Sequence, residues 1–555
     1  MRRSPWVPAT LLLMALAPGA RAADTPPAVD RHRPKPSGFF DFRDASAEFA
    51  SGLGTIPGLT CTIDSSTQPS IYAGNLLLDC DGENPHNETT IAVDPLDPDH
   101  AIGGFHTYLL TFNGSTVIAH IVGTTSVTFD GGRSWRQVIP PMRPYQSSGD
   151  PALAFDSRGR AYFATLADHE GETGNFTGPD IIVRLSGDGG LAWSLPVVLA
   201  EGLTGQTPRR TAGPTVFNDK PFIAVDGRAA SPFRDRAYVT WTRFSQFFNP
   251  RGGFFQAPIM LSSSDDGATW SAGRTISGRS PALCTAALSG APGDCDLNQD
   301  SYPSVAPGGR VYVGFENFNT PAENQILVVS SDDGGATWSD PARVDHVEDL
   351  NFPQNVDGRN TLTGCQLRYG VTANSAADPS DPSGRTVYVV WADNRNGSVV
   401  EDPSGTKTFT TNTDVFLGRS SDGGQTWQVI PVDTAANDQF YPWVAVAPGG
   451  RVDVGYMDRS YSAGQEECRY GFALTRISFD GGGHVASLSK SRVDTGLSDP
   501  GASRWFGLNS RFIGDYNGIA IDSTGATWSL WTDQRATVSS TSTRHGQHAV
   551  GAVTE

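Results

Sequence analysis

The chain has few charged residues and, among the basic ones, very few lysines. Its 555 residues are 18% charged, where about 25% is typical of soluble proteins. Lysine occurs only at Lys35, Lys220, Lys407 and Lys490, and 41 basic residues face 59 acidic ones, which leaves a formal net charge of −18. Proteins that bind nucleic acid or anionic membranes need a basic surface that displaces counterions. The composition therefore argues against both kinds of partner, and the scarcity of lysine means that no arginine is informative merely by being an arginine.

Long apolar segments are also scarce. An apolar run from Trp6 to Ala17 follows two arginines and precedes Ala20-Arg21-Ala22, an arrangement typical of a secretory signal peptide over residues 1–22. Beyond residue 22, no stretch of the sequence approaches the ~20 apolar residues of a membrane-spanning helix. We therefore expect a secreted or periplasmic protein, cleaved near Ala22, that is monomeric and has no membrane span.

Cysteine and histidine are infrequent. The six cysteines form no C-x-x-C pair and there are only 10 histidines, so a structural zinc site has little support. An even number of cysteines in an exported chain favours disulfides, although the sequence alone allows 15 pairings. Our preferred pairs are Cys61–Cys80 and Cys284–Cys295 within loops, and Cys365–Cys468 between neighbouring repeats.

Glycine and proline, by contrast, are abundant, with 62 and 38 residues, and both oppose helical bundles. Much of the glycine lies in a repeated motif, Ser/Thr-x-Asp-x-Gly-x-x-Trp. Five copies begin at Thr128, Ser186, Ser263, Ser331 and Ser420, and a sixth at Ser478 has lost its Trp. The residue types predict a β-hairpin turn in which Asp accepts backbone N–H groups, Gly adopts positive φ and Trp packs into a neighbouring layer.

Each motif is preceded by a pair of strand-like segments, for example residues 221–225 with 237–241 and residues 443–446 with 452–456. Seven such copies occur, each with about four strands, which predicts an all-β β-propeller with seven blades favoured and six as the alternative. The last copy shows only three strands, so we expect a strand from residues 38–60 to close the ring. The predicted organisation is a signal peptide (1–22), an N-terminal segment (23–85) and the propeller (86–555).

The turns resemble the Asp-box, or BNR, repeat of sialidases and related secreted glycoside hydrolases, over roughly residues 86–535. In that family these turns lie on the face opposite the active site. The resemblance therefore implies a structural role for Asp130, Asp188, Asp265, Asp333 and Asp422. It also implies a glycan or glycoconjugate as the partner, with any chemistry at the other face, where innermost strands start and second strands end.

The residues at those strand ends can be assigned to sialidase-like chemistry. Such chemistry needs an arginine clamp, a Tyr nucleophile beside a carboxylate and an acid/base carboxyl. The candidates are Arg368, Arg459 and Arg535 for the clamp, Tyr441 or Tyr516 for the nucleophile with Glu316 or Asp515 beside it, and Asp150 for the acid/base. Asp393 is a candidate substrate contact, although Asp393–Arg395 and Asp533–Arg535 also fit a repeated structural ion pair.

One departure from the family bears on the substrate. Sialidases of this family open the first blade with Arg-Ile-Pro, whereas this chain has His86-Asn87-Glu88 at that point. A glutamate at the position of a clamp arginine argues against sialic acid more than against glycan hydrolysis, so Glu88 becomes a candidate substrate contact. For a neutral sugar the same face offers a carboxylate pair for ordinary glycoside hydrolysis.

No cofactor is required by this chemistry, but one loop suggests calcium. Asp294, Asp296, Asn298 and Asp300 place oxygen side chains at alternate positions, as calcium loops do, without the Gly and Glu of an EF-hand. The alternative is an acidic loop stapled by a disulfide.

Three functions therefore remain open. The first is an exported glycoside hydrolase that removes terminal sugars, sialic acid among the candidates. The second is a non-catalytic propeller that binds carbohydrate or protein. The third is a polysaccharide lyase with His169 or Tyr302 as its base.

Overall fold

The computed structural model describes residues 60–555 except 83, 114–115, 169–178, 204–214, 250–251, 287–290, 322–323, 351–352, 355–358, 465–466, 503–511 and 538–541. The predicted signal peptide and most of the predicted closing strand lie outside the described residues. The described chain is all-β, and its helical segments are short 3-10 turns of three residues such as Ser70–Tyr72 and Arg459–Tyr461. Within this described part, none of the helices has the length and apolar character needed to cross a bilayer.

The strands form seven antiparallel blades in a ring, as predicted, and the alternative of six is excluded. Blade 1 contains β3 (His86–Val93), β4 (Ala101–Asn113), β5 (Thr116–Thr128) and β6 (Ser134–Val138), with β1 (Thr60–Asp64) added at its outer edge. Blade 2 contains β7 (Ser147–Phe155), β8 (Ala161–Asp168), β9 (Asp180–Ser186) and β10 (Val197–Ala200). Blade 3 contains β11 (Thr215–Val225), β12 (Ala237–Asn249), β14 (Ile259–Ser264) and β15 (Arg274–Thr275), with β13 (Gly252–Gln256) paired to β12.

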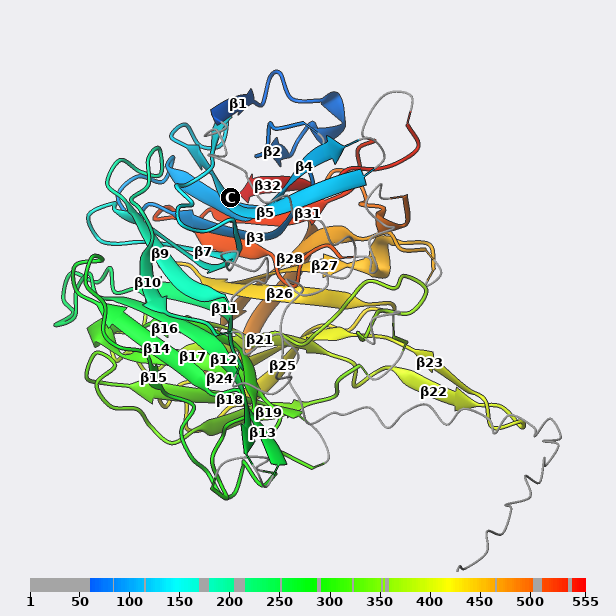
Figure 1. Ribbon diagram of the computed structural model, residues 1–555. Helices are drawn as coiled ribbons and strands as arrows, with labels where there is room; N and C mark the ends of the chain where they lie inside the picture. Colours follow the sequence, from blue (N-terminus) through cyan, green and yellow to red (C-terminus); the bar gives the residue numbers. More distant parts are fainter. Residues whose placement is uncertain are drawn as a thin grey trace, which may run out of the picture.

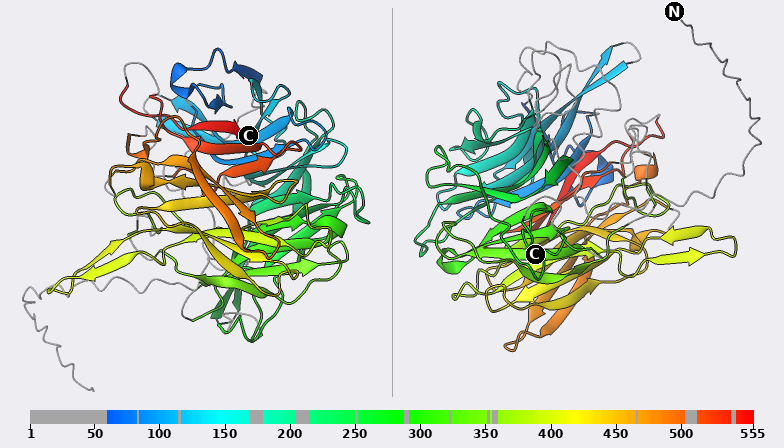
Figure 2. Two further views of the ribbon diagram at one scale, coloured as in Figure 1. Left: turned by 180° about the vertical axis from the view of Figure 1, so that it is seen from behind. Right: turned by 60° about the horizontal axis from the view of Figure 1, so that its bottom comes forward.

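The remaining four blades follow in chain order around the ring (Figures 1 and 2). Blade 4 contains β16 (Asn298–Val305), β17 (Val311–Asn317), β18 (Asn324–Ser331) and β19 (Ala342–Val347). Blade 5 contains β20 (Asn374–Ala377), β21 (Val387–Asp393), β24 (Asp414–Ser420) and β25 (Gln428–Asp433), and its hairpin of β22 (Ser398–Glu401) and β23 (Lys407–Thr410) projects from the body (Figure 1). Blade 6 contains β26 (Gln439–Val446), β27 (Val452–Asp458), β28 (Gly471–Phe479) and β29 (Val485–Arg492).

Blade 7 closes the ring by combining both ends of the chain. It contains β30 (Gly518–Ile521), β31 (Thr527–Asp533), β32 (His548–Thr554) and, as its outermost strand, β2 (Leu76–Leu77). The C-terminal strands accordingly lie beside the N-terminal ones, red next to blue in Figure 2. The closing strand therefore lies later in the chain than the expected range of 38–60, because β1, which begins at Thr60, extends blade 1 instead.

The aspartate turns join the third and fourth strands of their blades and bond as their sequence predicts. In the first turn, Thr128 donates its hydroxyl to Asp130, and the same carboxylate accepts the N–H of Ser134 at 2.9 Å. The Trp135 indole donates to the carbonyl of Gly132. Equivalent bonds to the aspartate occur at Asp188, Asp333 and Asp422.

The third turn differs from the motif as aligned in the sequence. There Asp266, not Asp265, accepts from Ser264, Ala268 and Thr269. This turn has one glycine where the others have two, so its hydroxyl and carboxylate both shift by one residue. Asp265 instead points outward and pairs with Arg236 at 2.5 Å.

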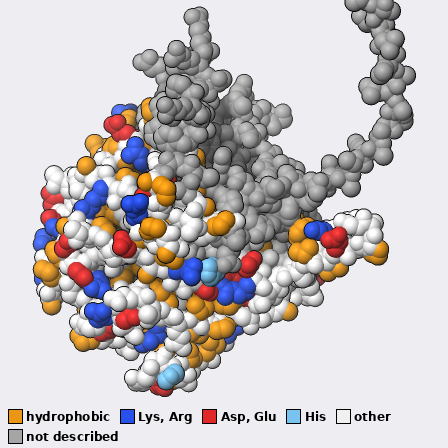
Figure 3. Space-filling view, turned by 90° about the horizontal axis from the view of Figure 1, so that it is seen from below, with side chains coloured by type: hydrophobic (Ala, Val, Ile, Leu, Met, Phe, Trp, Pro, Cys, Tyr) orange, Lys and Arg blue, Asp and Glu red, His pale blue; other side chains and the backbone are white. Residues whose placement is uncertain are grey.

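Three disulfides join Cys61–Cys80, Cys284–Cys295 and Cys365–Cys468, the pairs favoured above. The last connects the loop before blade 5 to the loop inside blade 6. On the face seen from below, the described Lys and Arg side chains are interspersed with Asp and Glu side chains (Figure 3). That view therefore shows no continuous basic patch on the described surface.

Candidate functional site

Five of the described innermost strands carry a β-bulge at the same place near their start. The pairing register slips by one residue in β3, β7, β11, β16 and β26. Each bulge holds a non-glycine residue at a φ between 50° and 56°, namely Glu88, Asp150, Lys220, Asp300 and Tyr441. Such left-handed positions are uncommon for residues with a side chain and tend to mark functional sites. A bulge also redirects its side chain, and the contacts below show that four of these five side chains meet at the axis of the ring.

Two cations and one carboxylate link blades that are not neighbours. Lys220 Nζ lies 2.9 Å from Asp515 Oδ2, and the Arg368 guanidinium contacts the same oxygen. Burial opposes ionisation of Asp515, but the charges of Arg368 and Lys220 outweigh it and lower the pKa of Asp515 to about 2. Lys220 is buried as well, and the surrounding carboxylates raise its pKa well above the usual value despite the burial. Asp515 is therefore ionised and Lys220 charged at neutral pH.

A second pair of carboxyl groups surrounds His106. His106 Nε2 lies 3.2 Å from Glu88 Oε2 and 3.7 Å from Asp150 Oδ1. The backbone N–H of Asp150 donates to this nitrogen at 2.6 Å, so His106 is neutral with its proton on Nδ1, beside Asn87 Oδ1 at 3.2 Å. Burial agrees with that assignment, because it lowers the pKa of His106 to about 4.

The same environment keeps Glu88 and Asp150 protonated to a higher pH than usual. Burial raises the pKa of Glu88, and burial together with the charge of Glu88 raises the pKa of Asp150 to about 7. Burial also raises the pKa of Asp300 well above its usual value. We call Glu88, His106, Asp150, Lys220, Asp300, Arg368 and Asp515 the axial cluster. It combines ionised and protonated carboxyl groups at one pH.

Aromatic side chains lie beside this cluster, further along the same strands. Phe222 follows Lys220 by two residues, Tyr302 follows Asp300, and Trp443 follows Tyr441. The rings of Phe222 and Tyr302 lie 4.1 Å apart, those of Tyr302 and Trp443 5.3 Å apart, and Tyr516 packs on Phe222 at 5.2 Å. Four blades thus form an apolar layer that lowers the local dielectric and strengthens the electrostatics of the cluster.

A comparison with protein families now places the fold. The model of the BNR repeat-like domain matches residues 160–454, more than half of the chain. The chain belongs to the BNR repeat-like family. No curated protein matches it significantly.

Several solved structures resemble this BNR-repeat propeller at low identity. The NanB sialidase from Streptococcus pneumoniae is 9% identical, with 89% of this chain and 97% of that chain covered and a TM-score of 0.40. The leech intramolecular trans-sialidase is 12% identical, with 74% and 68% covered and a TM-score of 0.39. The α-L-arabinofuranosidase from Fusarium graminearum is 12% identical, with 74% and 95% covered and a TM-score of 0.37. Similarity at this level says nothing about the activity of this chain.

The BNR-repeat propeller brings together some of the residues selected from the sequence. Glu88, Asp150, Arg368 and Asp515 belong to the axial cluster, and Tyr441 and Tyr516 adjoin it. The hydroxyl of Tyr441 donates to the carbonyl of Arg368 at 2.6 Å, and that of Tyr516 donates to the carbonyl of Pro151 at 3.3 Å. The structure therefore shows both candidate nucleophiles bonded to backbone oxygens.

The other selected residues contact different partners. Arg459 is fully buried against Asp438. Arg535 pairs with Asp533 at 2.7 Å, and Arg395 pairs with Asp393 at 2.6 Å. In both pairs a Trp indole also donates to the carboxylate, Trp531 to Asp533 and Trp391 to Asp393. The three arginines of the expected clamp are thus not assembled, and only Arg368 lies in the axial cluster.

Glu316 lies beside Asn324, whose amide donates to it at 3.2 Å. Burial raises the pKa of Glu316 well above its usual value, and the charges of Asp349 and Asp300 add to this effect. Tyr302 lies within the aromatic layer, and His169 is outside the described residues.

The side chains of the acidic loop considered for calcium contact different partners and do not converge on one point. Asp294 lies 3.4 Å from Arg279, Asp296 accepts from Asn319 at 2.9 Å, and Asn298 donates to the carbonyl of Cys295. Asp300 is instead buried close enough to Lys220 and Asp515 for their charges to act on its pKa. The Cys284–Cys295 disulfide staples this loop.

The sequence pattern assigns none of Lys220, His106 and Asp300 to the axial cluster. It suggests Asp300 only as a calcium ligand. A signal for the bulges exists in the chain. Proline follows the bulged residue at Asp150-Pro151, Lys220-Pro221 and Tyr441-Pro442. A repeated residue-proline step at the start of an innermost strand would have grouped these positions.

Proposed function

We propose that this BNR-repeat propeller is a glycoside hydrolase whose reaction takes place at the axial cluster. The observation that carries the proposal is the separation of two carboxyl pKa values within one cluster, about 7 for Asp150 and about 2 for Asp515. When two carboxyl groups of one site differ this much in pKa, one can act as an acid while the other stays ionised. Glycoside hydrolysis needs both, because the leaving oxygen is protonated while positive charge develops on the sugar.

In this mechanism Asp150 is the general acid. Its carboxyl group carries a proton up to about pH 7 and delivers it to the glycosidic oxygen. Asp515 stays ionised and faces the developing positive charge, as a nucleophile or as the base for a water molecule. The distance between the carboxyl groups of Asp150 and Asp515 in the substrate complex distinguishes the two roles. A distance of ~5–5.5 Å indicates a nucleophile and retention, and ~6.5–9.5 Å indicates a base and inversion.

The substrate we propose is a neutral terminal sugar. Sialic acid carries a carboxylate that is bound by several arginines in the chemistry considered above, whereas the described arginines near the axis, Arg368 and Arg359, both act on the carboxylate of Asp515. Arg368 is already bound to Asp515, and Glu88 and Asp150 would face an anionic sugar. A cluster rich in carboxyl groups suits the hydroxyl groups of a neutral sugar, because each carboxyl oxygen can accept a hydrogen bond.

A panel of fluorogenic glycosides tests the proposal on the protein from Ala23 to Glu555. We expect turnover on at least one neutral glycoside and none on a sialoside or a uronic glycoside. Turnover on the sialoside alone would overturn the substrate assignment. The absence of turnover on every member of the panel would overturn the proposed hydrolase activity.

A non-catalytic glycan-binding propeller is the second candidate. The observation in its favour is that the hydroxyls of Tyr441 and Tyr516 donate to backbone carbonyls instead of to a carboxylate, so neither is activated as a nucleophile. Binding on a glycan array together with the absence of turnover would support this second function.

A further inference from the structure

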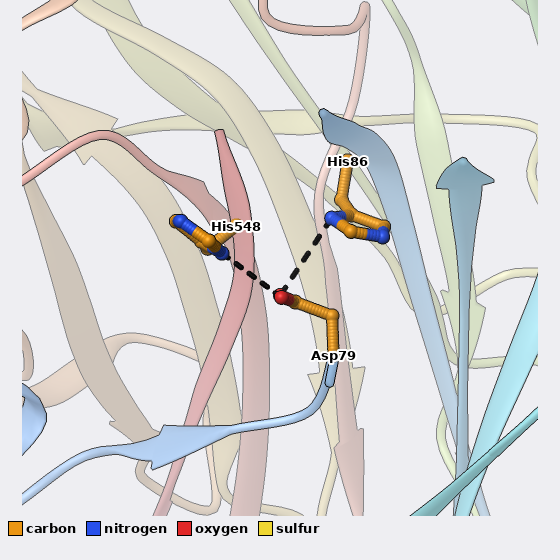
Figure 4. A group of neighbouring side chains, drawn as sticks. All are labelled: Asp79, His86 and His548. Carbon is orange, nitrogen blue, oxygen red and sulfur yellow. Dashed lines mark hydrogen bonds and ion pairs between the residues drawn. The ribbon is translucent and has the colours of Figure 1, made fainter. Parts of the chain in front are cut away.

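A group of histidine and aspartate side chains lies where the ring closes, away from the aromatic layer. Asp79 follows β2, His86 is the first residue of β3 and His548 is the first residue of β32. These three segments come from the N-terminal segment, blade 1 and blade 7. Figure 4 shows their side chains pointing toward one another, with Asp79 between the two imidazole rings.

The distances in this group approach those of a metal site. Asp79 Oδ1 lies 2.9 Å from His548 Nδ1, and Asp79 Oδ2 lies 3.8 Å from His86 Nδ1. One ligand atom from each of the three residues lies within 4.8 Å of the others. A tetrahedral ion with bonds of about 2.0–2.2 Å holds its ligand atoms roughly 3.3–3.6 Å apart. Small side-chain rotations therefore bring the three ligand atoms to binding distance.

A surrounding layer of contacts orients the ligands. Asp81 Oδ1 lies 3.0 Å from His86 Nε2, the ring nitrogen that points away from Asp79. The backbone N–H of Ala549 donates to Asp79 Oδ2 at 2.8 Å. A carboxylate on the outer nitrogen of a histidine is the usual support of a metal-binding imidazole, because it fixes the tautomer and the ring orientation.

Burial and access also suit a bound ion. The side chains of His86 and Asp79 are 0% and 2% exposed, whereas that of His548 is 14% exposed. The ligands are thus shielded from water on the side of β3 and reachable on the side of β32.

We propose that Asp79, His86 and His548 form a binding site for a divalent transition metal, with zinc as the preferred ion and a water molecule as the fourth ligand. Two imidazole nitrogens and one carboxylate are a zinc-type donor set, whereas calcium and magnesium prefer oxygen donors alone. The ion connects the N-terminal segment to the first and last blades and so stabilises the closed ring. This proposal does not depend on the proposed hydrolase activity.

The carboxylates and imidazole of the axial cluster form a comparable group, but their contacts argue against a metal there. His106 Nε2 already accepts the backbone N–H of Asp150, and Lys220 Nζ lies 3.8 Å from Glu88 Oε1. The ammonium group occupies the electrostatic role that a metal ion would have. At the ring closure, the described residues within ion-pair distance of Asp79 and Asp81 are histidines, and the backbone contact of His86 Nδ1, to the carbonyl oxygen of Gln547, is longer at 3.4 Å.

Zinc titration of the metal-free protein tests the site. The protein is dialysed against a chelator and titrated with Zn²⁺ alone in competition with a chromophoric chelator, and its metal content is then measured by mass spectrometry. We expect one zinc per chain. We also expect saturating Zn²⁺ to raise the Tm by about 3 °C and chelator to reverse the rise, because an ion bound only by the folded state stabilises it.

Three variants give the test its specificity. His548→Gln can still donate a hydrogen bond to Asp79 but offers no ring nitrogen, so it should lose both the stoichiometric zinc and the Tm shift. Asp81→Asn should bind zinc about 10–100-fold more weakly, as expected for a supporting contact. His484→Gln, which alters an exposed histidine in a distant turn, should bind zinc like the native chain.

Two results would overturn the proposal. One is the absence of zinc binding by the folded native protein, which would leave the group as an ion-pair network only. The other is equal zinc binding by the native chain and His548→Gln. The Tm of each variant without metal identifies any that fails to fold.

Discussion

Lys220 and Asp515 form a 2.9 Å ion pair across the axis of the propeller, although 295 residues separate them in the chain. They come from blade 3 and from the start of blade 7, which are not adjacent in the ring. Arg368, which precedes blade 5, binds the same carboxylate. The pair therefore connects non-adjacent blades through charge, whereas the sheets of the described strands each lie within one blade.

Replacement of Lys220 by Met should destabilise the protein strongly. The variant leaves the ionised Asp515 buried with less compensating charge, and breaking a buried ion pair costs about 3–5 kcal/mol. Urea unfolding followed by fluorescence measures the loss. The matched control is Lys407→Met, because Lys407 is half exposed and lies 3.7 Å from Glu401, and an exposed pair contributes about 0–1 kcal/mol. Equal stability of the two variants would contradict the role given to the axial ion pair.

Replacement of Asp150 by Asn should remove the acid of the proposed reaction. The substitution keeps the shape of the side chain but not its transferable proton, so kcat should fall about 10²–10⁴-fold on any glycoside that the native protein hydrolyses. Native activity should also decline as pH rises through about 7, the pKa of Asp150. Asp130→Asn, in an aspartate turn at the opposite end of the sheets, should keep its kcat.

The same carboxyl group makes a prediction about stability that needs no substrate. Its pKa is higher in the folded protein, about 7, than the usual value of 3.8, so folding is favoured while Asp150 is protonated. That contribution is complete below about pH 4 and is lost as pH rises through about 7. The free energy of unfolding of Asp150→Asn should therefore increase relative to the native protein between pH 5 and pH 8. A constant difference over this range would argue against the raised pKa.

The two adjacent aspartates of the third turn should behave differently. Asp266 accepts backbone and hydroxyl donors within the turn, and these bonds lower its pKa to about 2. Asp265 makes an exposed ion pair with Arg236. Differential scanning calorimetry at pH 7 should show a clear drop in Tm for Asp266→Ala and little change for Asp265→Ala. The reverse order would restore the original motif alignment, with Asp265 in the turn.

Removal of the long-range disulfide should cost more than removal of a local one. Cys365–Cys468 closes 103 residues and Cys284–Cys295 closes 11. The chain-entropy estimate gives about 4.7 kcal/mol for the first and about 2.8 kcal/mol for the second. Chemical unfolding of the two double Cys→Ser variants measures both losses. If the Cys284–Cys295 variant is the less stable one, local strain or packing outweighs chain entropy.

The sequence predicts the fold better than the site, and particular residues show why. The aspartate turns depend on contacts within eight residues, so a motif beginning at Thr128 or Ser331 is sufficient to recognise them. Arg368 precedes the innermost strand of its blade, whereas Arg459 and Arg535 follow the second strand of theirs. Of the three, only Arg368 reaches the axis, because Asp438 and Asp533 bind the other two. The repeated Asp-x-Arg pattern does indicate the Asp533–Arg535 pair, whereas the pairing of Arg459 with Asp438 depends on loop geometry that the repeat does not encode.

The alternation of apolar and polar residues does not reveal the bulges, for which the residue-proline steps are the sequence signal. A slip of one residue in β11 directs Lys220 to the axis, whereas an unbroken strand would alternate its side chains regularly. The closing strand β2 has only two residues, Leu76 and Leu77, too few to show any periodicity. Such features follow from tertiary packing and closure of the ring, which act after the local pattern has set the strands.

Because β2 pairs with β32, the ring can close only after the C-terminal strand has been synthesised. Leu76 and Leu77 bond to Gly551 and Val550, at the far end of the sequence. During synthesis the first blades can form from local pairs, but β2 has no edge to join until residues 548–554 have emerged. A chain truncated before β32 should therefore remain an open arc with exposed blade edges, and proteases should cleave it faster than they cleave the full chain.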